Sequence, residues 1–242
     1  MGESDINAVN AILDIHTHKG EEQSGGKAII NYRQLAGTPL QEGYYYSVGI
    51  HPWELTPDNL KQQSDFIIEH LPDKRIVAIG EGGLDKLKGA SMEIQTAAFM
   101  AQMTLSMEYD LPLILHNVRM TDKILAVKKQ FRPGQPWIWH GFRGKPEQVE
   151  QLQGKGLYLS FGEFYSDEAM RAVSDDRLFL ETDESSLDIE ELLYRAARVR
   201  GVGVETLRET IRRNIQNVFF LGIRININLG RDTAGHKINL IC

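Results

Sequence analysis

The chain has 242 residues, of which 42% are hydrophobic and 25% are charged, a composition typical of one globular α/β domain rather than two small ones. Its formal net charge of −6 argues against a broad electrostatic grip on nucleic acid, although a local basic cleft stays open. The sequence has no apolar run of membrane-spanning length, and its one cysteine, Cys242, excludes a framework of intrachain disulfides. Residues 1–5 lack the pattern of a signal peptide. We therefore expect a cytoplasmic protein that contacts no membrane and needs no obligate protein partner.

Short apolar segments alternate with helical patterns, which indicates repeated strand and helix units and a parallel sheet. Seven segments of strand length are visible and an eighth is not obvious; they are residues 11–16, 44–50, 75–80, 113–115, 136–139, 158–161 and 178–182. Helical patterns cover residues 92–109, 120–130, 146–153, 188–199 and 204–214. The first of these patterns places five residues near one face, namely Ile94, Ala97, Ala98, Ala101 and Leu105. We predict a single TIM-like (β/α) barrel over residues 1–221.

The C-terminal tail, residues 222–242, does not fit this alternation. Ile223–Leu229 alternates like a half-buried strand. The tail is either an added strand or a loose, disordered end, and we assign it no function.

Polar residues of metal-ligand type follow five of the predicted strands. They are His16, His18, Glu81, His116, His140 and Asp183. The carboxyl ends of parallel barrel strands converge on one face, where active sites lie. His16 and His18 are two residues apart, so a strand directs both to one face, while Asp14 would point away and orient neighbouring groups. A lone histidine at a strand end is often only a structural residue, but the joint occurrence of six such residues favours a metal site.

Glu81 is followed by two glycines, Gly82 and Gly83, which permit a tight backbone turn. A carboxylate held there could bridge two cations. The alternative interpretation of this segment alone is a glycine turn with a solvated acid.

The order of the motifs resembles that of the TatD-type metal-dependent hydrolases and deoxyribonucleases. The motifs are Asp14-x-His16-x-His18, Gly49-x-His51-Pro52, Gly80-Glu81-x-Gly83-Leu84-Asp85, His116-x-x-Arg119, His140-Gly141-Phe142 and Glu181-Thr182-Asp183, with Gln95, Phe99, Gln102, Asn214 and Phe219 as further matches. The resemblance covers residues 12 to 221 and implies a barrel with two divalent cations, Mg²⁺, Mn²⁺ or Zn²⁺.

By this resemblance, each cation has its own ligands and one carboxylate is shared. The first cation would be held by His16, His18, Glu81 and Asp183, and the second by His116 and His140 together with the shared Glu81. His51 would lie beside them and contact substrate or water.

Three local departures from the family pattern concern the rim of the site. Gly82 stands where a larger apolar residue is usual, and Asn117-Val118 intervenes before Arg119. The segment Glu184–Ser186 replaces the small residue and proline that commonly follow the last aspartate. These changes leave the predicted ligands intact, but they bear on the choice of substrate.

Two cations would activate a water molecule and stabilise the leaving oxygen, with Asp183 and Glu81 as the catalytic residues. The candidate phosphate contacts are Arg119, Arg143 and Lys145. The candidate stacking surfaces for bases are Trp53, Phe142 and Phe161, although Phe161 also suits a core position. The side chains of Arg119, Arg143 and Lys145 could equally be ordinary solvated loop charges.

The leading hypothesis is a 3'-5' exodeoxyribonuclease that acts on single-stranded or frayed DNA ends. The second is a metal-dependent hydrolase of a small ester, amide or phosphoester. The third is a metal-stabilised interaction protein without catalysis, which the complete ligand set disfavours because simple structure does not need these groups.

Overall fold

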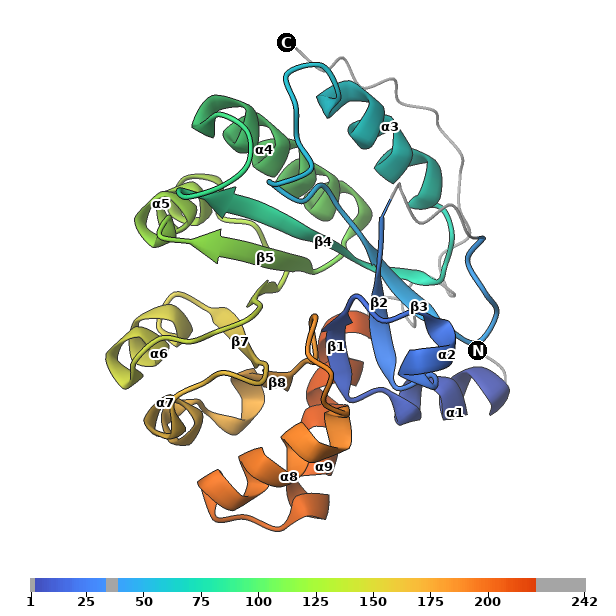
Figure 1. Cartoon of the computed structure of the whole chain (residues 1–242), viewed down its shortest axis with the longest axis vertical. Coiled ribbons are helices and arrows are strands. Elements are labelled where there is room, and N and C mark those ends of the chain that lie inside the picture. The colour runs from blue at the N-terminus through green and yellow to red at the C-terminus, as the bar shows by residue number, and fades with distance from the viewer. Residues whose placement is uncertain (1–2, 34–38, 221–242) are drawn as a thin grey trace.

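The fold is known from a computed structural model that describes residues 3–33 and 39–220. Eight parallel strands close into a barrel in chain order, and the helices lie on its outside (Figure 1). The strands are β1 (Asp14–Thr17), β2 (Ala28–Tyr32), β3 (Tyr45–Val48), β4 (Ile76–Asp85), β5 (Leu113–Val118), β6 (Trp137–Trp139), β7 (Leu157–Phe161) and β8 (Leu178–Leu180). The predicted TIM-like barrel is confirmed.

The helices that follow the strands form the outer layer. They are α1 (Glu3–Ala11), α2 (Glu21–Ser24), α3 (Leu60–His70), α4 (Met92–Tyr109), α5 (Thr121–Phe131), α6 (Pro146–Gln153), α7 (Asp167–Ala172), α8 (Ile189–Arg200) and α9 (Val204–Ile215), with a 3₁₀ turn, η2 (Asp175–Arg177), and a π-helical turn, η3 (Gln216–Phe220). The sequence patterns place α4 and α6 at their observed bounds, and they place α5, α8 and α9 within one residue. They miss α1, α2, α3 and α7.

The eighth strand, which the sequence does not reveal, is β2. It lies between β1 and β3 and pairs in parallel with both. The strand has five residues and begins soon after the glycine turn Gly25–Gly26. None of the predicted ligands follows it, so no site residue marks it in the sequence.

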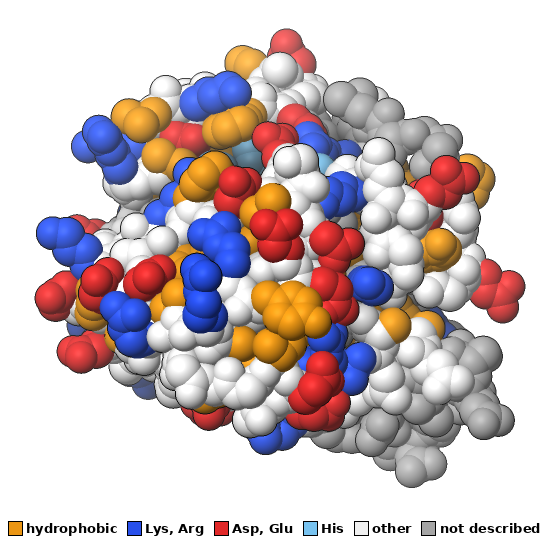
Figure 2. Space-filling model, turned by 60° about the horizontal axis from the view of Figure 1, so that its bottom comes forward, with side chains coloured by type: hydrophobic (Ala, Val, Ile, Leu, Met, Phe, Trp, Pro, Cys, Tyr) orange, Lys and Arg blue, Asp and Glu red, His pale blue; other side chains and the backbone are white. Residues whose placement is uncertain are grey.

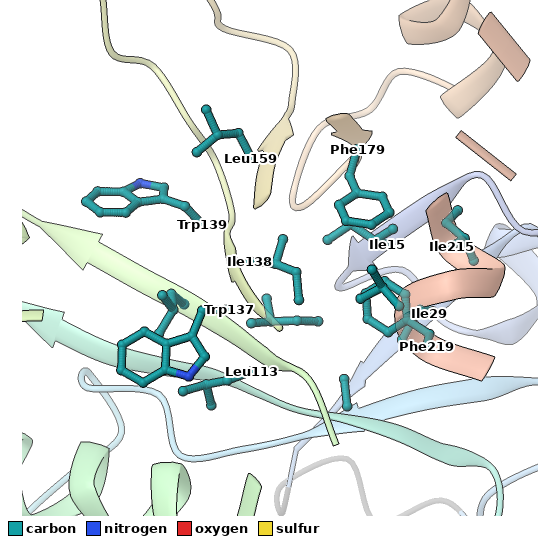
Figure 3. Close-up of a cluster of buried hydrophobic side chains, with 14 of the residues drawn as sticks. Ile15, Ile29, Leu113, Trp137, Ile138, Trp139, Leu159, Phe179, Ile215 and Phe219 are labelled. Atoms are coloured by element: carbon teal, nitrogen blue, oxygen red, sulfur yellow. The ribbon is translucent and has the colours of Figure 1, made fainter. Parts of the chain in front are cut away.

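Large apolar side chains fill the barrel and the layer between strands and helices (Figure 3). Trp137 of β6 is fully buried and lies 5.7 Å from Phe99 of α4, measured between ring centroids. Phe179 of β8 lies 5.7 Å from Phe219 of η3. Burying one such side chain stabilises the fold by about 1.5–3 kcal/mol. These contacts tie α4 and η3 to the strands.

Two sequence expectations about membranes and the tail have different outcomes. No helix among residues 3–33 and 39–220 is both long and apolar enough to cross a membrane. The tail at residues 222–242, expected to be an added strand or a disordered end, lies outside the described residues.

Candidate metal centre

The six predicted ligand residues lie together at the carboxyl ends of the strands. β1 carries His16 and leads into His18, β4 contains Glu81, and β5 contains His116. His140 directly follows β6, and Asp183 follows β8. Their potential ligand atoms fall into groups within 4.8 Å of one another, which are His16 with His140 and Asp183, His16 with His18 and Glu81, and His51 with Glu81 and His116.

The Glu81 carboxylate lies at the centre of the site, and each of its oxygens faces a different set of histidines. Oε2 is 3.2 Å from Nε2 of His16 and 3.5 Å from Nε2 of His18. Oε1 is 2.6 Å from Nδ1 of His116 and 2.7 Å from Nε2 of His140. Because the side chain is buried, this one carboxylate joins the two sets across the interior of the barrel mouth.

Asp183 closes the first set from the side that is open to solvent. Its Oδ1 lies 3.3 Å from Nε2 of His18 and 3.7 Å from Nε2 of His16. The aspartate side chain is 30% exposed, whereas that of Glu81 is 3% exposed. Asp183 therefore presents a carboxylate both to the histidines and to anything that enters the mouth.

His51 lies closer to the site than a peripheral contact would. Its Nε2 is 3.3 Å from Oε1 of Glu81, and its ring centroid is 4.6 Å from that of His116. The sequence placed His51 beside the site as a contact for substrate or water. The structure puts it on the same carboxylate oxygen that His116 and His140 contact.

The chemistry of these residues fits a divalent cation. His16 is fully buried, its Nδ1 has no hydrogen-bond partner among the described residues, and its Nε2 approaches Glu81 without hydrogen-bond geometry. A buried polar atom without a partner is costly. Imidazole nitrogens and carboxylate oxygens are the ligands that Zn²⁺ and Mn²⁺ take in proteins, and a cation would supply the missing partner of Nε2.

The electrostatics of the cluster support the same interpretation. Burial alone would raise the pKa of Glu81, but the charge of His140 and hydrogen bonds from His116 and His140 hold it well below its usual value. Burial would lower the pKa of His140, but Glu81 and Glu181 raise it well above 6.5. For His18, burial is outweighed by Asp183 and Glu81, which raise the pKa to about 9. Protons thus occupy imidazoles beside the carboxylates, and a bound cation would displace them.

Two buried carboxylates behind the site hold the second set of histidines. Oε1 of Glu181 is 3.1 Å from Nδ1 of His140 and accepts the backbone N–H of Gly141 at 2.5 Å. Oδ2 of Asp85 is 3.4 Å from Nε2 of His116. Carboxylates that contact the far nitrogen of a ligating histidine fix its ring and tautomer. Both residues belong to motifs quoted above, but the sequence alone did not assign them this role.

Arg33, just after β2, is a further residue near the site, and no sequence pattern singles it out. Its Nη2 contacts Nδ1 of His18, and its Nη1 donates to Oε1 of Glu54 at 2.9 Å. The guanidinium therefore anchors the ring of His18 from the side away from Glu81.

Asp14 orients the chain on both sides of the site, as its position in the strand predicts. Its Oδ1 accepts the backbone N–H groups of His16 and Thr182, both at 3.1 Å. Its Oδ2 accepts the hydroxyl of Thr182 at 2.6 Å. Burial raises the pKa of Asp14 to about 7, and these hydrogen bonds act against that rise. The side chain ties β1 to the segment that carries Asp183.

Helix α4 braces the site strands with two buried glutamines, and this changes the predicted face of the helix. Oε1 of Gln102 accepts the N–H of Ile50 at 2.8 Å, and Oε1 of Gln95 accepts the N–H of Asp85 at 2.8 Å. Ala97, predicted to share a face with Ala98 and Leu105, is exposed while those two residues are buried. The expectation for Ala97 was wrong because polar side chains that satisfy buried backbone groups occupy the inward face.

Gly82 leaves room for the side-chain amide of Gln102. A Cβ built on Gly82 would collide with the Oε1 and Nε2 atoms of that amide. In this structure a larger side chain at position 82 would have to displace the glutamine from Ile50. The glycine therefore accommodates the position that Gln102 takes in this chain.

Gly82→Ala is expected to destabilise the protein by about 1–3 kcal/mol, the usual cost of overpacking a filled core. The free energy of unfolding in urea, with circular dichroism as the probe, measures this. Gly134→Ala is the control, because a Cβ there meets nothing within 4 Å. Equal stability of the two variants would contradict the proposed fit between Gly82 and Gln102.

A profile of the protein family described as TatD related DNase matches residues 17–220. The match covers most of the chain and includes every residue of the cluster except His16. The chain belongs to the TatD family. This is a family of metal-dependent hydrolases, in agreement with the cluster of histidines and carboxylates.

Curated relatives carry names of two kinds. The uncharacterized metal-dependent hydrolase YabD of Bacillus subtilis is 31% identical over 148 residues, which are 57% of this chain and 58% of that protein. The 3'-5' ssDNA/RNA exonuclease TatD of Erwinia billingiae is 33% identical over 172 residues, 66% of this chain and 65% of that protein. This chain thus aligns with less than two thirds of the length of each.

The solved structures of TatD homologues share the barrel. The crystal structure of YJJV, a TatD homologue from Escherichia coli, superposes with a TM-score of 0.71 at 22% identity, and the match covers 87% of this chain and 98% of that one. A TatD family hydrolase from Entamoeba histolytica gives a TM-score of 0.66 at 16% identity, and the match covers 90% of this chain and 90% of that one. These likenesses concern the fold.

The predicted phosphate contacts of this TatD-family protein lie on exposed loops. Arg119 follows β5 with a positive φ of 56°, and Lys145 precedes α6. The guanidinium of Arg143 lies 5.1 Å from the ring centroid of Phe164. Among the described residues, none of these three basic side chains forms an ion pair with a carboxylate of the cluster.

Of the three predicted stacking surfaces, only Trp53 is accessible. Phe142 and Phe161 are buried and pack together at 5.5 Å, so the stacking assignment of Phe142 was wrong and the core alternative holds for Phe161. Trp53 is 44% exposed, and its ring centroid lies 4.8 Å from that of His51. Phe164, which the sequence did not single out, is 60% exposed.

Proposed function

We propose that this protein is a two-cation hydrolase that cleaves phosphodiester bonds at single-stranded or frayed DNA ends, as a 3'-5' exodeoxyribonuclease. The observation that carries the proposal is the Glu81 carboxylate, whose Oε2 faces His16 and His18 while Oε1 faces His116 and His140. Two divalent cations, Mg²⁺, Mn²⁺ or Zn²⁺, bound there would activate a water and stabilise the leaving oxygen. The residues that would hold them are His16, His18, Glu81, His116, His140 and Asp183.

Asp183 is suited to accept the proton of the attacking water. Burial would raise the pKa of Asp183, but the hydrogen bond from His18 and the charges of His16 and His140 lower it. The carboxylate is therefore ionised at neutral pH and reaches the open side of the site. Glu181 and Asp85 position His140 and His116, so the proposed ligands do not need to reorganise during the reaction.

On the loops around the site, two aromatic side chains each lie beside a basic side chain, and these pairs support a nucleic-acid substrate. Nζ of Lys88 lies 3.5 Å from the ring centroid of Trp53, and Arg143 lies over Phe164. Exposed aromatic faces stack on bases of any sequence, and adjacent cations contact phosphates. Several relatives are named 3'-5' ssDNA/RNA exonucleases, which agrees with this assignment.

The charge pattern on one face of the protein favours a short contact with the end of a strand. On the face shown in Figure 2, basic side chains alternate with acidic ones and form no continuous basic surface. Extended binding of duplex DNA depends on many phosphate contacts. A strand end held by a few residues at the mouth of the barrel needs far fewer phosphate contacts.

Hydrolysis of a small ester, amide or phosphoester is the second candidate, and the acidic rim favours it. Ser185 donates to Oε2 of Glu163 at 2.7 Å, and the neighbouring Glu184 is exposed. The carboxylates of Glu163 and Glu184 at the rim repel a polyanion such as DNA, but they do not repel a small neutral ester.

A comparison of substrates with and without metal tests the proposal. The chain is treated with chelator, and Mg²⁺, Mn²⁺ or Zn²⁺ is then added to labelled single-stranded DNA, blunt duplex DNA or a panel of small esters. We expect metal-dependent release of nucleotides from the 3' end of single-stranded DNA. Efficient metal-dependent ester turnover with intact DNA would establish the second candidate. Absence of turnover on every substrate would leave a non-catalytic interaction protein.

Arg143→Ala is expected to raise the KM for single-stranded DNA about tenfold with little change in kcat, because a phosphate contact is lost. The plot of the logarithm of the binding constant against the logarithm of the salt concentration should become less steep by about one unit. Steady-state kinetics at several salt concentrations measure both quantities. Arg171→Ala removes an exposed arginine of α7 that pairs with Glu168 and should change neither. Equal effects of the two variants would exclude a specific role for Arg143.

A further inference from the structure

A second group of cationic side chains surrounds a pocket at the other end of the barrel. The pocket has a volume of about 310 Å³ and is lined by Leu125, Lys128, Lys129, Arg132, Pro133 and Lys155. These residues belong to α5 and to the loops that lead from α5 into β6 and from α6 into β7. Loops that precede strands lie at the amino ends of the strands, opposite the face that carries the metal centre. We call this group the basic pocket.

The charges of the basic pocket are not neutralised by neighbouring acids. In the part of the chain that the structure describes, no ion pair joins Lys128, Lys129, Arg132 or Lys155 to a carboxylate. Instead, Nζ of Lys128 lies 4.9 Å from the ring centroid of Trp137. Burial and the charge of Arg177 lower the pKa of Lys128. Like charges thus converge here in a chain whose net charge is −6.

Favourable contact with helix ends does not account for this convergence. Cations near the C-terminus of a helix offset a partial charge of about −0.5. The ends of α5 and α6 together supply about one negative charge, against the four cations of the pocket. Most of the positive charge therefore remains available to a ligand.

The backbone at Arg132 sets where this side chain leaves α5. This residue caps α5 with a φ of +47°, in the left-handed region that favours glycine or asparagine. Asp110 ends α4 with a similar φ of 54°, so this is an ordinary helix end, and it places Arg132 at the edge of the pocket.

We propose that the basic pocket binds a small, multiply charged phosphate compound of nucleotide size, such as a nucleoside diphosphate. The volume of the pocket is at the lower end of the range for small-molecule sites. Arg132 and the three lysines would contact the phosphate oxygens, and Leu125 and Pro133 would pack against the remainder of the ligand. This inference does not depend on the nuclease proposal, because the pocket and the metal centre lie at opposite ends of the barrel.

Isothermal titration calorimetry of the whole chain with ADP and with inorganic pyrophosphate tests the proposal. Chelator is kept present so that phosphate cannot bind through metal at the catalytic end. We expect saturable one-to-one binding that weakens as salt is added. Arg132→Gly and Lys155→Gln should each raise the dissociation constant about tenfold or more, because each removes a charge-assisted contact.

Arg132→Gly separates binding from folding. Glycine suits the positive φ, so this variant should melt at the same temperature as the parent chain or higher, while its affinity falls. Arg143→Gln, at the catalytic end, should leave the affinity for ADP unchanged. The proposal is overturned if no saturable binding occurs, or if Arg143→Gln weakens binding while Arg132→Gly does not. It is also overturned if a single-stranded oligonucleotide binds the basic pocket more tightly than ADP.

Discussion

Replacing Glu81 with alanine is expected to lower turnover by at least about 10³-fold, because the cations that it would hold in the proposed site would supply several kcal/mol of transition-state stabilisation. Bound metal should fall from two ions per chain to less than one, since each oxygen of Glu81 faces its own set of histidines. Metal analysis of the purified variant, beside steady-state kinetics, measures both effects. The loss of both ions on removal of one side chain is the expected signature of a bridging ligand.

His140→Ala provides the comparison. Of the two Glu81 oxygens, His140 contacts Oε1, so this variant should lose mainly one ion. Circular dichroism shows whether each variant is folded. A folded Glu81→Ala protein with an unchanged metal count would refute the bridging role.

Asp183→Asn is expected to lower kcat on the preferred substrate by about 10²–10⁴-fold, because the amide cannot accept the proton of the attacking water. The change preserves size, and KM should change much less than kcat because Asp183 is not proposed to anchor the strand. Single-turnover kinetics at saturating metal isolate the chemical step. Glu184→Gln alters the neighbouring exposed acid and should stay within about twofold of the parent chain. A similar fall in both variants would assign the effect to the charge of the rim.

The sequence predicts the barrel and the cluster well because both follow from local rules. Ligand-type residues such as His116 and His140 directly close apolar strands, and parallel strands bring their carboxyl ends together. That rule places six distant residues within reach of one another without any knowledge of packing. The helix bounds follow for similar reasons, since α4 begins after Ser91, whose side chain accepts the N–H of Ile94.

The residues that sequence reasoning missed depend on packing between distant elements. Arg33 reaches His18 only because β2 is inserted beside β1, and β2 itself has no distinctive pattern. Phe142 and Phe164 are both aromatic residues in loops after strands, yet one is buried against Phe161 and the other is exposed. Their burial depends on the path of each loop, which a one-dimensional pattern does not record.

The most direct test of the central claim is electron paramagnetic resonance of the metal-free chain titrated with Mn²⁺. Two ions that share the Glu81 carboxylate would lie about 3.5–4 Å apart, as in other two-metal sites, and their spins would couple. We predict binding of two Mn²⁺ ions per chain and a coupled spectrum that disappears in Glu81→Ala. A single bound ion, or the six-line spectrum of isolated Mn²⁺ at full occupancy, would contradict the account.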